Sequence, residues 1–205
     1  MGMFKRGVYL CAAIALTACG GQAPESQQEP GAELATQEAG LTGGTSQGCA
    51  FNIFYVQRPG VLPPVYDIRL NRAASDTCAW GQASLLLGSS TNFSPRISLA
   101  ANDLGVAVSW VYKNSPSGSS PSVLALRHVD PGTMTVVRSE GLSAGMFGSG
   151  SIYTGDLNIL TDGTTVTVTG TKSAAISGET GSGSNYVATY ADFFTSTTPR
   201  TVVAY

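Results

Sequence analysis

Histidine is nearly absent from this sequence, because His128 is the single one among 205 residues. One histidine and no H-E-x-x-H pattern leave too few ligands for a zinc centre. No D-x-[DN]-x-[DN]-G loop is present to hold calcium. The sequence therefore predicts no metal site and no other cofactor.

Charged side chains are also scarce, at 12% of the chain. Residues 49–205 carry nine basic and nine acidic residues, so this part has no formal net charge. Proteins that bind nucleic acid need a basic surface that neutralises phosphates, and no such stripe is present. We therefore expect no nucleic-acid partner.

The apolar run near the N-terminus is too short to cross a membrane. It covers only residues 7–16 and follows Lys5 and Arg6, whereas a spanning helix needs about 20 apolar residues. Basic residues before a short apolar run are typical of a signal peptide. We predict that residues 1–18 form this signal.

The sequence at the end of the signal, Leu16-Thr17-Ala18-Cys19, resembles the lipobox of bacterial lipoproteins. The resemblance covers about the first twenty residues. It implies cleavage before Cys19, a diacylglyceryl group on its sulfur and an acyl chain such as palmitate on its amino group. It also implies a bacterial envelope protein, in the outer membrane because no aspartate follows Cys19. The alternative is an ordinary secretory signal that leaves Cys19 free.

Residues 20–48 lack aromatic and basic residues and contain four glutamates among many Gly, Gln, Ser and Pro residues. Such a composition buries too little apolar surface to fold. As a flexible coil this segment spans roughly 30 Å. We therefore predict that residues 19–48 are a lipidated cysteine followed by a tether, and that the folded domain covers 49–205.

Only four cysteines are present, and two of them belong to the N-terminal segment. Cys11 leaves with the signal and Cys19 is the predicted lipidation site, so Cys49 and Cys78 remain. In an exported domain this pair is predicted to form a disulfide. Closing a loop of this size contributes about 3 to 4 kcal/mol in the chain-entropy model.

The rest of the chain alternates with the period of β-strands, and no segment of helical length has a 3.6-residue period. In residues 65–71 the alternation places Tyr66, Ile68 and Leu70 on one face. Turn signals such as Asn102-Asp103-Leu104-Gly105 and Asp162-Gly163 separate such runs. We predict an all-β domain of about eleven strands.

The strand pattern also repeats. Residues 96–139 read strand, turn, strand, loop, strand, turn, strand, and residues 156–205 have the same order. An earlier unit keeps the last two or three strands, 65–72 followed by 76–82. Antiparallel meanders of four strands resemble the blades of propeller-repeat surface lipoproteins of bacteria. The resemblance implies a partial β-propeller, and the alternative is a β-sandwich.

A serine nucleophile is suggested by Gly141-Leu142-Ser143-Ala144-Gly145, which fits G-x-S-x-G. A nucleophile elbow needs a helix after the serine and a histidine further downstream. The following residues are too glycine-rich for a helix, and His128 lies upstream. We therefore interpret 141–145 as a loop and His128 as a packing residue. Asp103, Asp130 and Asp162 stand in turns, where aspartate accepts bonds from backbone amides.

Aromatic side chains give the remaining functional hint. Trp80, Trp110 and Tyr112 are candidate ligand-binding residues for a glycan or a protein, with core packing as the alternative. The sequence thus favours a membrane-anchored, non-catalytic lipoprotein domain that binds a ligand or an envelope protein. The alternative is a serine- or acid-dependent hydrolase of the cell envelope.

Overall fold

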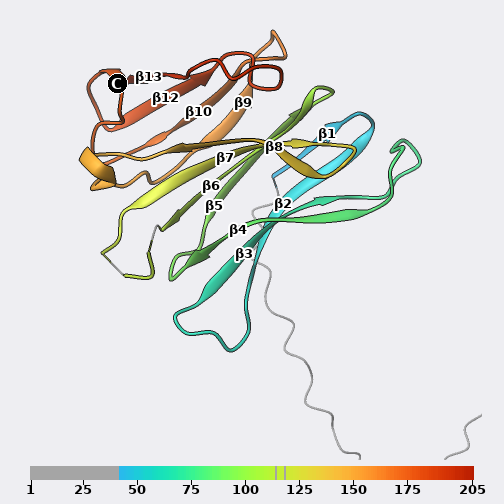
Figure 1. Ribbon diagram of the computed structural model, residues 1–205, viewed down its shortest axis with the longest axis horizontal. Coiled ribbons are helices and arrows are strands. Elements are labelled where there is room, and N and C mark those ends of the chain that lie inside the picture. Colours follow the sequence, from blue (N-terminus) through green and yellow to red (C-terminus); the bar gives the residue numbers. More distant parts are fainter. Residues whose placement is uncertain (1–41, 114, 118) are drawn as a thin grey trace, which may run out of the picture. The chain divides into compact units, whose positions relative to one another are not determined.

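The computed structural model describes residues 42–113, 115–117 and 119–205, all within the compact unit Ala35–Tyr205. These residues contain strands and one 3-10 turn at Met146–Gly148, with no α-helix among them (Figure 1). The all-β class is therefore confirmed for this part of the chain. No helix here has the length and apolar character needed to cross a membrane. The strands are β1 (Thr42–Ser46), β2 (Cys49–Gln57), β3 (Val65–Arg72), β4 (Ala83–Thr91), β5 (Arg96–Asn102), β6 (Gly105–Lys113), β7 (Ser122–Asp130), β8 (Thr135–Leu142), β9 (Asp156–Ile159), β10 (Val166–Thr171), β11 (Glu179–Gly181), β12 (Asn185–Tyr190) and β13 (Thr201–Ala204).

The strands form three sheets, none of them closed. The first sheet has the order β1-β2-β3-β4 and the second the order β5-β6-β7-β8, both antiparallel meanders of consecutive strands. The third sheet has the order β11-β13-β12-β10-β9, in which β11 pairs parallel to β13. Short turns between antiparallel neighbours favour such meanders.

The repeated strand order predicted from the sequence is present in the second and third sheets. Residues 96–139 contain β5, β6, β7 and most of β8, and residues 156–205 contain β9, β10, β12 and β13 in the same order. Leu70, His128 and Tyr190 lie on the third strand of their respective units, and all three are buried. The strand order is thus shared, but the neighbours differ: Leu70 packs between the first and second sheets, whereas His128 and Tyr190 lie between the second and third.

The first unit differs from its prediction in residues 76–82, which form a loop instead of a strand. Two bonds fix this loop to the first sheet in a non-strand conformation: Cys78 is disulfide-bonded to Cys49, and Arg72 Nε donates a hydrogen bond to the carbonyl oxygen of Gly81 at 2.9 Å. The fourth strand is β4, which begins at Ala83. The first unit therefore has four strands.

The first sheet also starts before the predicted domain boundary at Cys49. Strand β1 lies inside the segment predicted as tether and forms a hairpin with β2. Gly44 permits a close approach here, because a Cβ at this position would lie 2.8 Å from Leu99 Cδ2. The glycine-rich composition did not prevent strand pairing, because the hydrogen bonds to β2 use only backbone groups. The strand also packs against β5, where small residues fit.

The second sheet lies between the other two and is covered on both faces. One core joins it to the first sheet through residues such as Leu70 and Val108, and the other joins it to the third sheet through residues such as Val111 and Val168. Strand β6 is buried on both faces from Gly105 to Val111. This explains its almost continuous apolar sequence.

Hydrogen bonds between hairpin turns connect the three sheets. Gln47, in the β1–β2 turn, donates from its backbone nitrogen to Asp103 Oδ1 at 2.9 Å and from Nε2 to Asp103 O at 3.0 Å. Asn102, the last residue of β5, donates from Nδ2 to Gly163 O at 2.6 Å. The first strands of the sheets, β1, β5 and β9, are therefore neighbours that run in the same direction.

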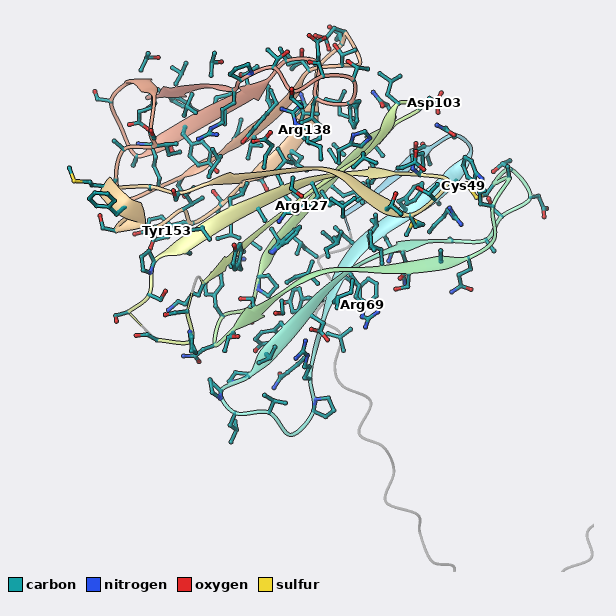
Figure 2. The ribbon with its side chains drawn as sticks, in the orientation of Figure 1. Cys49, Arg69, Asp103, Arg127, Arg138 and Tyr153 are labelled. Carbon is teal, nitrogen blue, oxygen red and sulfur yellow. A yellow bond between two sulfur atoms is a disulfide. The ribbon has the colours of Figure 1, made fainter. Side chains whose placement is uncertain are left out.

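This arrangement gives the domain two different ends. The turn end carries the hairpin turns that follow β1, β5, β7 and β9, together with the loops 73–82 and 191–200. The loop end carries the segments 58–64, 92–95, 143–155 and 172–184. Strand β1 enters the first sheet at the loop end. In Figure 2, Asp103 and Cys49 lie at one end and Tyr153 at the other.

Candidate ligand-binding groove

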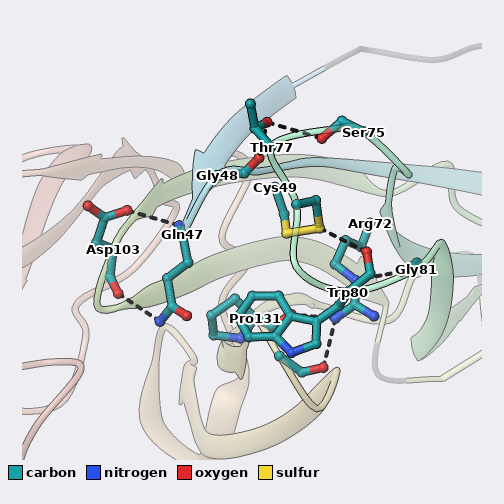
Figure 3. The surroundings of a disulfide bond; sticks show 12 residues. Gln47, Gly48, Cys49, Arg72, Ser75, Thr77, Trp80, Gly81, Asp103 and Pro131 are labelled. Carbon is teal, nitrogen blue, oxygen red and sulfur yellow. Dashed lines mark hydrogen bonds between the residues drawn. A yellow bond between two sulfur atoms is a disulfide. The ribbon is translucent and has the colours of Figure 1, made fainter.

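The turn end contains the disulfide between Cys49 and Cys78, whose Cα atoms lie 4.4 Å apart (Figure 3). The predicted pairing is confirmed. Cys49 is fully buried at the start of β2, and Cys78 lies in the loop 73–82. The bond fixes this loop to the first sheet, so it has a structural role.

Arg72 fastens the same loop to the second sheet. Its Nη1 donates to the carbonyl oxygens of Pro131 at 2.6 Å and Gly132 at 2.7 Å, while its guanidinium lies 5.5 Å from the centre of the Trp80 ring. Trp80 also lies against Gly132, where a Cβ would come within 2.8 Å of the indole. Trp80 therefore packs beside the disulfide, between Arg72 and Gly132, as Figure 3 shows for Arg72.

The three aromatic residues predicted as ligand-binding candidates do not come together. Trp110 is only 3% exposed and packs in the core between the first and second sheets, 6.4 Å from the ring of Tyr112. The guanidinium of Arg127 lies 5.2 Å from the Trp110 ring. Trp80 is at the turn end. These contacts show that all three rings pack against neighbouring side chains. A ligand-binding role for them stays a prediction.

The turn aspartates satisfy backbone amides. Asp130 Oδ1 accepts bonds from the amides of Gly132 at 3.0 Å and Thr133 at 2.7 Å. The pKa of Asp130 is lowered, and the main cause is the hydrogen bonds that its carboxylate accepts from Thr133. Asp162 accepts from the amides of Thr164 and Thr165, and the bonds from Thr165 are the main cause of its lowered pKa. The prediction that these aspartates form turns is confirmed. Among the described residues, no cluster of three potential ligands is placed to hold a metal ion.

Ser143 and His128 lie far apart along the second sheet. His128 pairs with Arg138 near the turn end, whereas Leu142, next to Ser143, pairs with Leu124 at the loop end. Five residues along β8 correspond to about 17 Å. Ser143 is exposed and is followed by a three-residue 3-10 turn. The two residues therefore do not form a nucleophile–base pair.

His128 is a packing residue, as predicted. It is 8% exposed and lies 5.0 Å from Phe194 and 6.0 Å from Phe193, measured between ring centres. Burial lowers its pKa, and the nearby positive charge of Arg138 acts in the same direction. Asp130 and the Leu104 backbone act in the opposite direction but are outweighed. The imidazole is therefore held neutral.

A hollow lies at the loop end, where all three sheets contribute side chains. A cavity of about 530 Å³ and a second of about 320 Å³ share Tyr55, Pro95 and Arg96 and so form one open groove. The end of β2 and the start of β3 supply Tyr55 and Tyr66, whose rings meet edge to face at 5.6 Å. The remaining lining residues are Pro64, Asn92, Phe93, Ser94, Ile97, Thr154, Gly155 and Asp156.

The groove combines half-buried aromatic rings with exposed charges of both signs. Arg96 begins β5 and Asp156 begins β9, and both side chains are exposed. Within the described chain neither side chain has a hydrogen-bond or ion-pair partner. Flat rings beside exposed charged groups that no other side chain engages suit a small ligand with an apolar face and several polar groups.

The sequence did not point to the groove residues as a site. Tyr66 was recognised only as a member of a strand face, while Tyr55, Arg96 and Asp156 carried no motif. They come from three sheets, and Tyr55 and Asp156 are 101 positions apart in the chain. Only the order in which the sheets pack brings them together.

Comparison with known proteins adds no relative. No family model matches the chain, and neither the curated proteins nor the solved structures contain a significant match. Cys19 and the signal peptide lie outside the described residues, so lipidation stays a prediction.

Proposed function

We propose that this chain is a bacterial lipoprotein whose β-domain binds a ligand without catalysis, in the groove between Tyr55 and Asp156. The anchor would be the acylated Cys19, and the membrane would be the outer membrane of the cell envelope. The observation that carries the proposal is the groove itself, which unites aromatic rings and uncommitted charged groups from three sheets.

The architecture that best accounts for this groove is three blades of a partial propeller. Supporting this reading, β1, β5 and β9 lie side by side and run in the same direction, as the innermost strands of neighbouring blades do. The sheets also stack in sequence order, with the second between the first and third. A β-sandwich, the alternative, would need only two packed layers.

The ligand class we propose is a saccharide. Sugar rings present an apolar face that packs on tyrosine, and their hydroxyl groups accept from a guanidinium and donate to a carboxylate. Arg96 and Asp156 provide these two groups in the groove, and Asn92 adds an amide whose Nδ2 also donates to Pro116 O at 3.3 Å. Binding should be weak for one sugar, because the groove is open rather than enclosed.

A non-catalytic role is supported by the position of Ser143. No histidine lies beside the exposed serine, because His128 is buried near the opposite end of the β7–β8 hairpin. An activity-based serine probe should therefore not label Ser143. Labelling that is lost in the Ser143→Ala variant would favour the hydrolase alternative.

The binding proposal can be tested with the purified lipidated protein on an array of bacterial oligosaccharides. Arg96→Ala and Tyr66→Ala should each lower the affinity for a bound glycan at least about tenfold, since each removes a good contact. Tyr153→Ala is the matched control, because Tyr153 is 51% exposed and does not line the groove. Equal affinities in all three variants would place the ligand elsewhere.

The anchor is tested separately. Labelled fatty acid should enter the wild-type protein and should not enter the Cys19→Ser variant. Equal incorporation into both proteins, or none into either, would contradict lipidation at Cys19.

A further inference from the structure

The three most exposed large apolar side chains of the described chain all lie at the loop end. Phe147 is 100% exposed, Leu62 is 90% exposed and Met146 is 78% exposed. They occupy the tips of two loops, 58–64 between β2 and β3 and 143–155 between β8 and β9 (Figure 1). Single exposed apolar residues are common, but three extreme cases on two loops at one end indicate an interaction surface.

The loop that carries Met146 and Phe147 is built to hold them outward. At its base, Ala144 pairs with Gly150 and with Ile176. Phe147 has a φ of 55°, in the left-handed region that a phenylalanine rarely adopts. Hydrogen bonds within the turn, from Gly148 N to Gly145 O and from Ser149 N to Met146 O, both at 3.2 Å, hold this backbone, in which the ring of Phe147 is fully exposed.

The tips of both loops are free of charge, and Arg58, at the start of the first loop, is paired with Asp67. Residues 59–64 and 143–155 contain no Asp, Glu, Lys or Arg. The turn end differs, because five of the nine acids of residues 49–205 lie there against three bases, Arg72, Arg138 and Arg200, which leaves a net negative charge. These acids are Asp76, Asp103, Asp130, Asp162 and Asp192. An anionic membrane surface therefore repels the turn end and does not repel the two loop tips.

The chain enters the domain at this same end. Strand β1 begins at Thr42 and runs parallel to β5, whose first residue, Arg96, lies in the groove at the loop end. The segment that precedes Thr42 contains Cys19, so an anchor on Cys19 tethers the domain by its loop end.

We infer that the loop end is a membrane-docking surface, in which Leu62, Met146 and Phe147 enter the interfacial layer of the bilayer that holds the anchor. This inference rests on the proposed function, because the anchor supplies the bilayer. Apolar tips on uncharged loops insert shallowly, and the tether keeps them at high local concentration near the lipid. The groove then opens close to the membrane, where its ligand would be met.

The experiment places a fluorescent reporter at each end of the processed, lipidated protein on phosphatidylcholine vesicles that contain brominated lipid. Phe147→Trp and Leu62→Trp report on the loop end. Leu104→Trp is the matched control, because Leu104 is an exposed turn residue at the turn end. The native Trp110 is buried and Trp80 lies at the turn end, so the unsubstituted protein gives the background.

We expect the brominated lipid to quench the added fluorescence of Phe147→Trp and Leu62→Trp at least about twofold more than that of Leu104→Trp, because insertion reaches about 5 to 10 Å into the bilayer. Their emission should also shift to shorter wavelength on binding. Equal quenching at both ends would overturn the inference, as would loop tips that a protein partner covers and keeps from lipid.

Failure of the anchor gives a different result. A protein without acyl chains would not float with the vesicles, and mass spectrometry of its N-terminal peptide would lack the lipid. A protein that floats but whose loop-tip variants are no more quenched than Leu104→Trp would retain the anchor and contradict only the docking surface.

Discussion

The two ends of this domain use their polar and apolar groups in opposite ways. At the turn end, Asp130, Asp162 and Arg72 form hydrogen bonds with backbone groups. A disulfide there ties the loop 73–82 to the first sheet. At the loop end, Arg96 and Asp156 have no partner in the described chain. The difference teaches that the turn end holds the frame, while the groove at the loop end keeps charged groups available for binding beside the paired Arg58–Asp67 and Lys172–Glu179.

The largest expected effect concerns the turn end. Replacing both Cys49 and Cys78 by alanine should lower the free energy of unfolding by about 3 to 4 kcal/mol, because the crosslink closes a long loop in the unfolded chain. Urea titration with and without reductant measures this, and reductant should not change the stability of the double variant. A loss near zero would mean that the loop 73–82 is held without the crosslink.

A second prediction concerns packing at the loop end. In Gly170→Ala the new Cβ would collide with the backbone carbonyl of Thr154, so stability should fall by about 1 to 3 kcal/mol. Gly81→Ala is the control, because nothing lies near a Cβ there and its φ is ordinary. We expect Gly81→Ala to stay within about 0.5 kcal/mol of the wild type. Equal urea midpoints for Gly170→Ala and Gly81→Ala would show that the segment 143–155, which contains Thr154, moves aside at little cost in stability.

Two tyrosines on β12 give a smaller, matched test. Tyr186, towards the loop end, donates its hydroxyl proton to Thr154 O at 2.8 Å, so Tyr186→Phe should lose about 1 kcal/mol. Tyr190, towards the turn end, has a buried hydroxyl without a partner in the described chain. Tyr190→Phe should therefore be neutral or slightly stabilising. Thermal unfolding of both variants decides, and a larger loss in Tyr190→Phe would contradict this assignment.

The smallest expected effect is the pH dependence of stability from His128. Burial lowers its pKa, so the unfolded chain takes up the proton first, and stability falls as the pH drops through about 6.5. His128→Gln should remove this slope. The lowered pKa values of Asp130 and Asp162 act at lower pH: their stabilisation is present above about pH 3.9 and is lost as these groups protonate. Unfolding free energies at pH 7, 5 and 3 separate the two ranges, and an unchanged slope in His128→Gln would exclude the histidine as its source.

Local patterns in the sequence predicted most of the strands and the turn chemistry. The alternation around Ile68 and Leu70 and the turn signals at Asp130 and Asp162 each depend on neighbouring residues alone. The strand at 76–82 was wrong, because the bonds of Cys78 and Gly81 outweigh local β-propensity. Strand β1 was missed, because its glycines and small polar residues carry no hydrophobic alternation and pair only where β2 and β5 are present.

By itself, the sequence determined the all-β class, the repeated strand order and the pairing of Cys49 with Cys78, since these depend on periodicity and on the small number of cysteines. The tertiary structure alone decided which side chains meet. Tyr55, Arg96 and Asp156 share a groove, and Leu62 and Phe147 share an end, because three sheets pack in a fixed order and direction. A one-dimensional pattern records which face of a strand is buried, but it does not record which other strand covers that face.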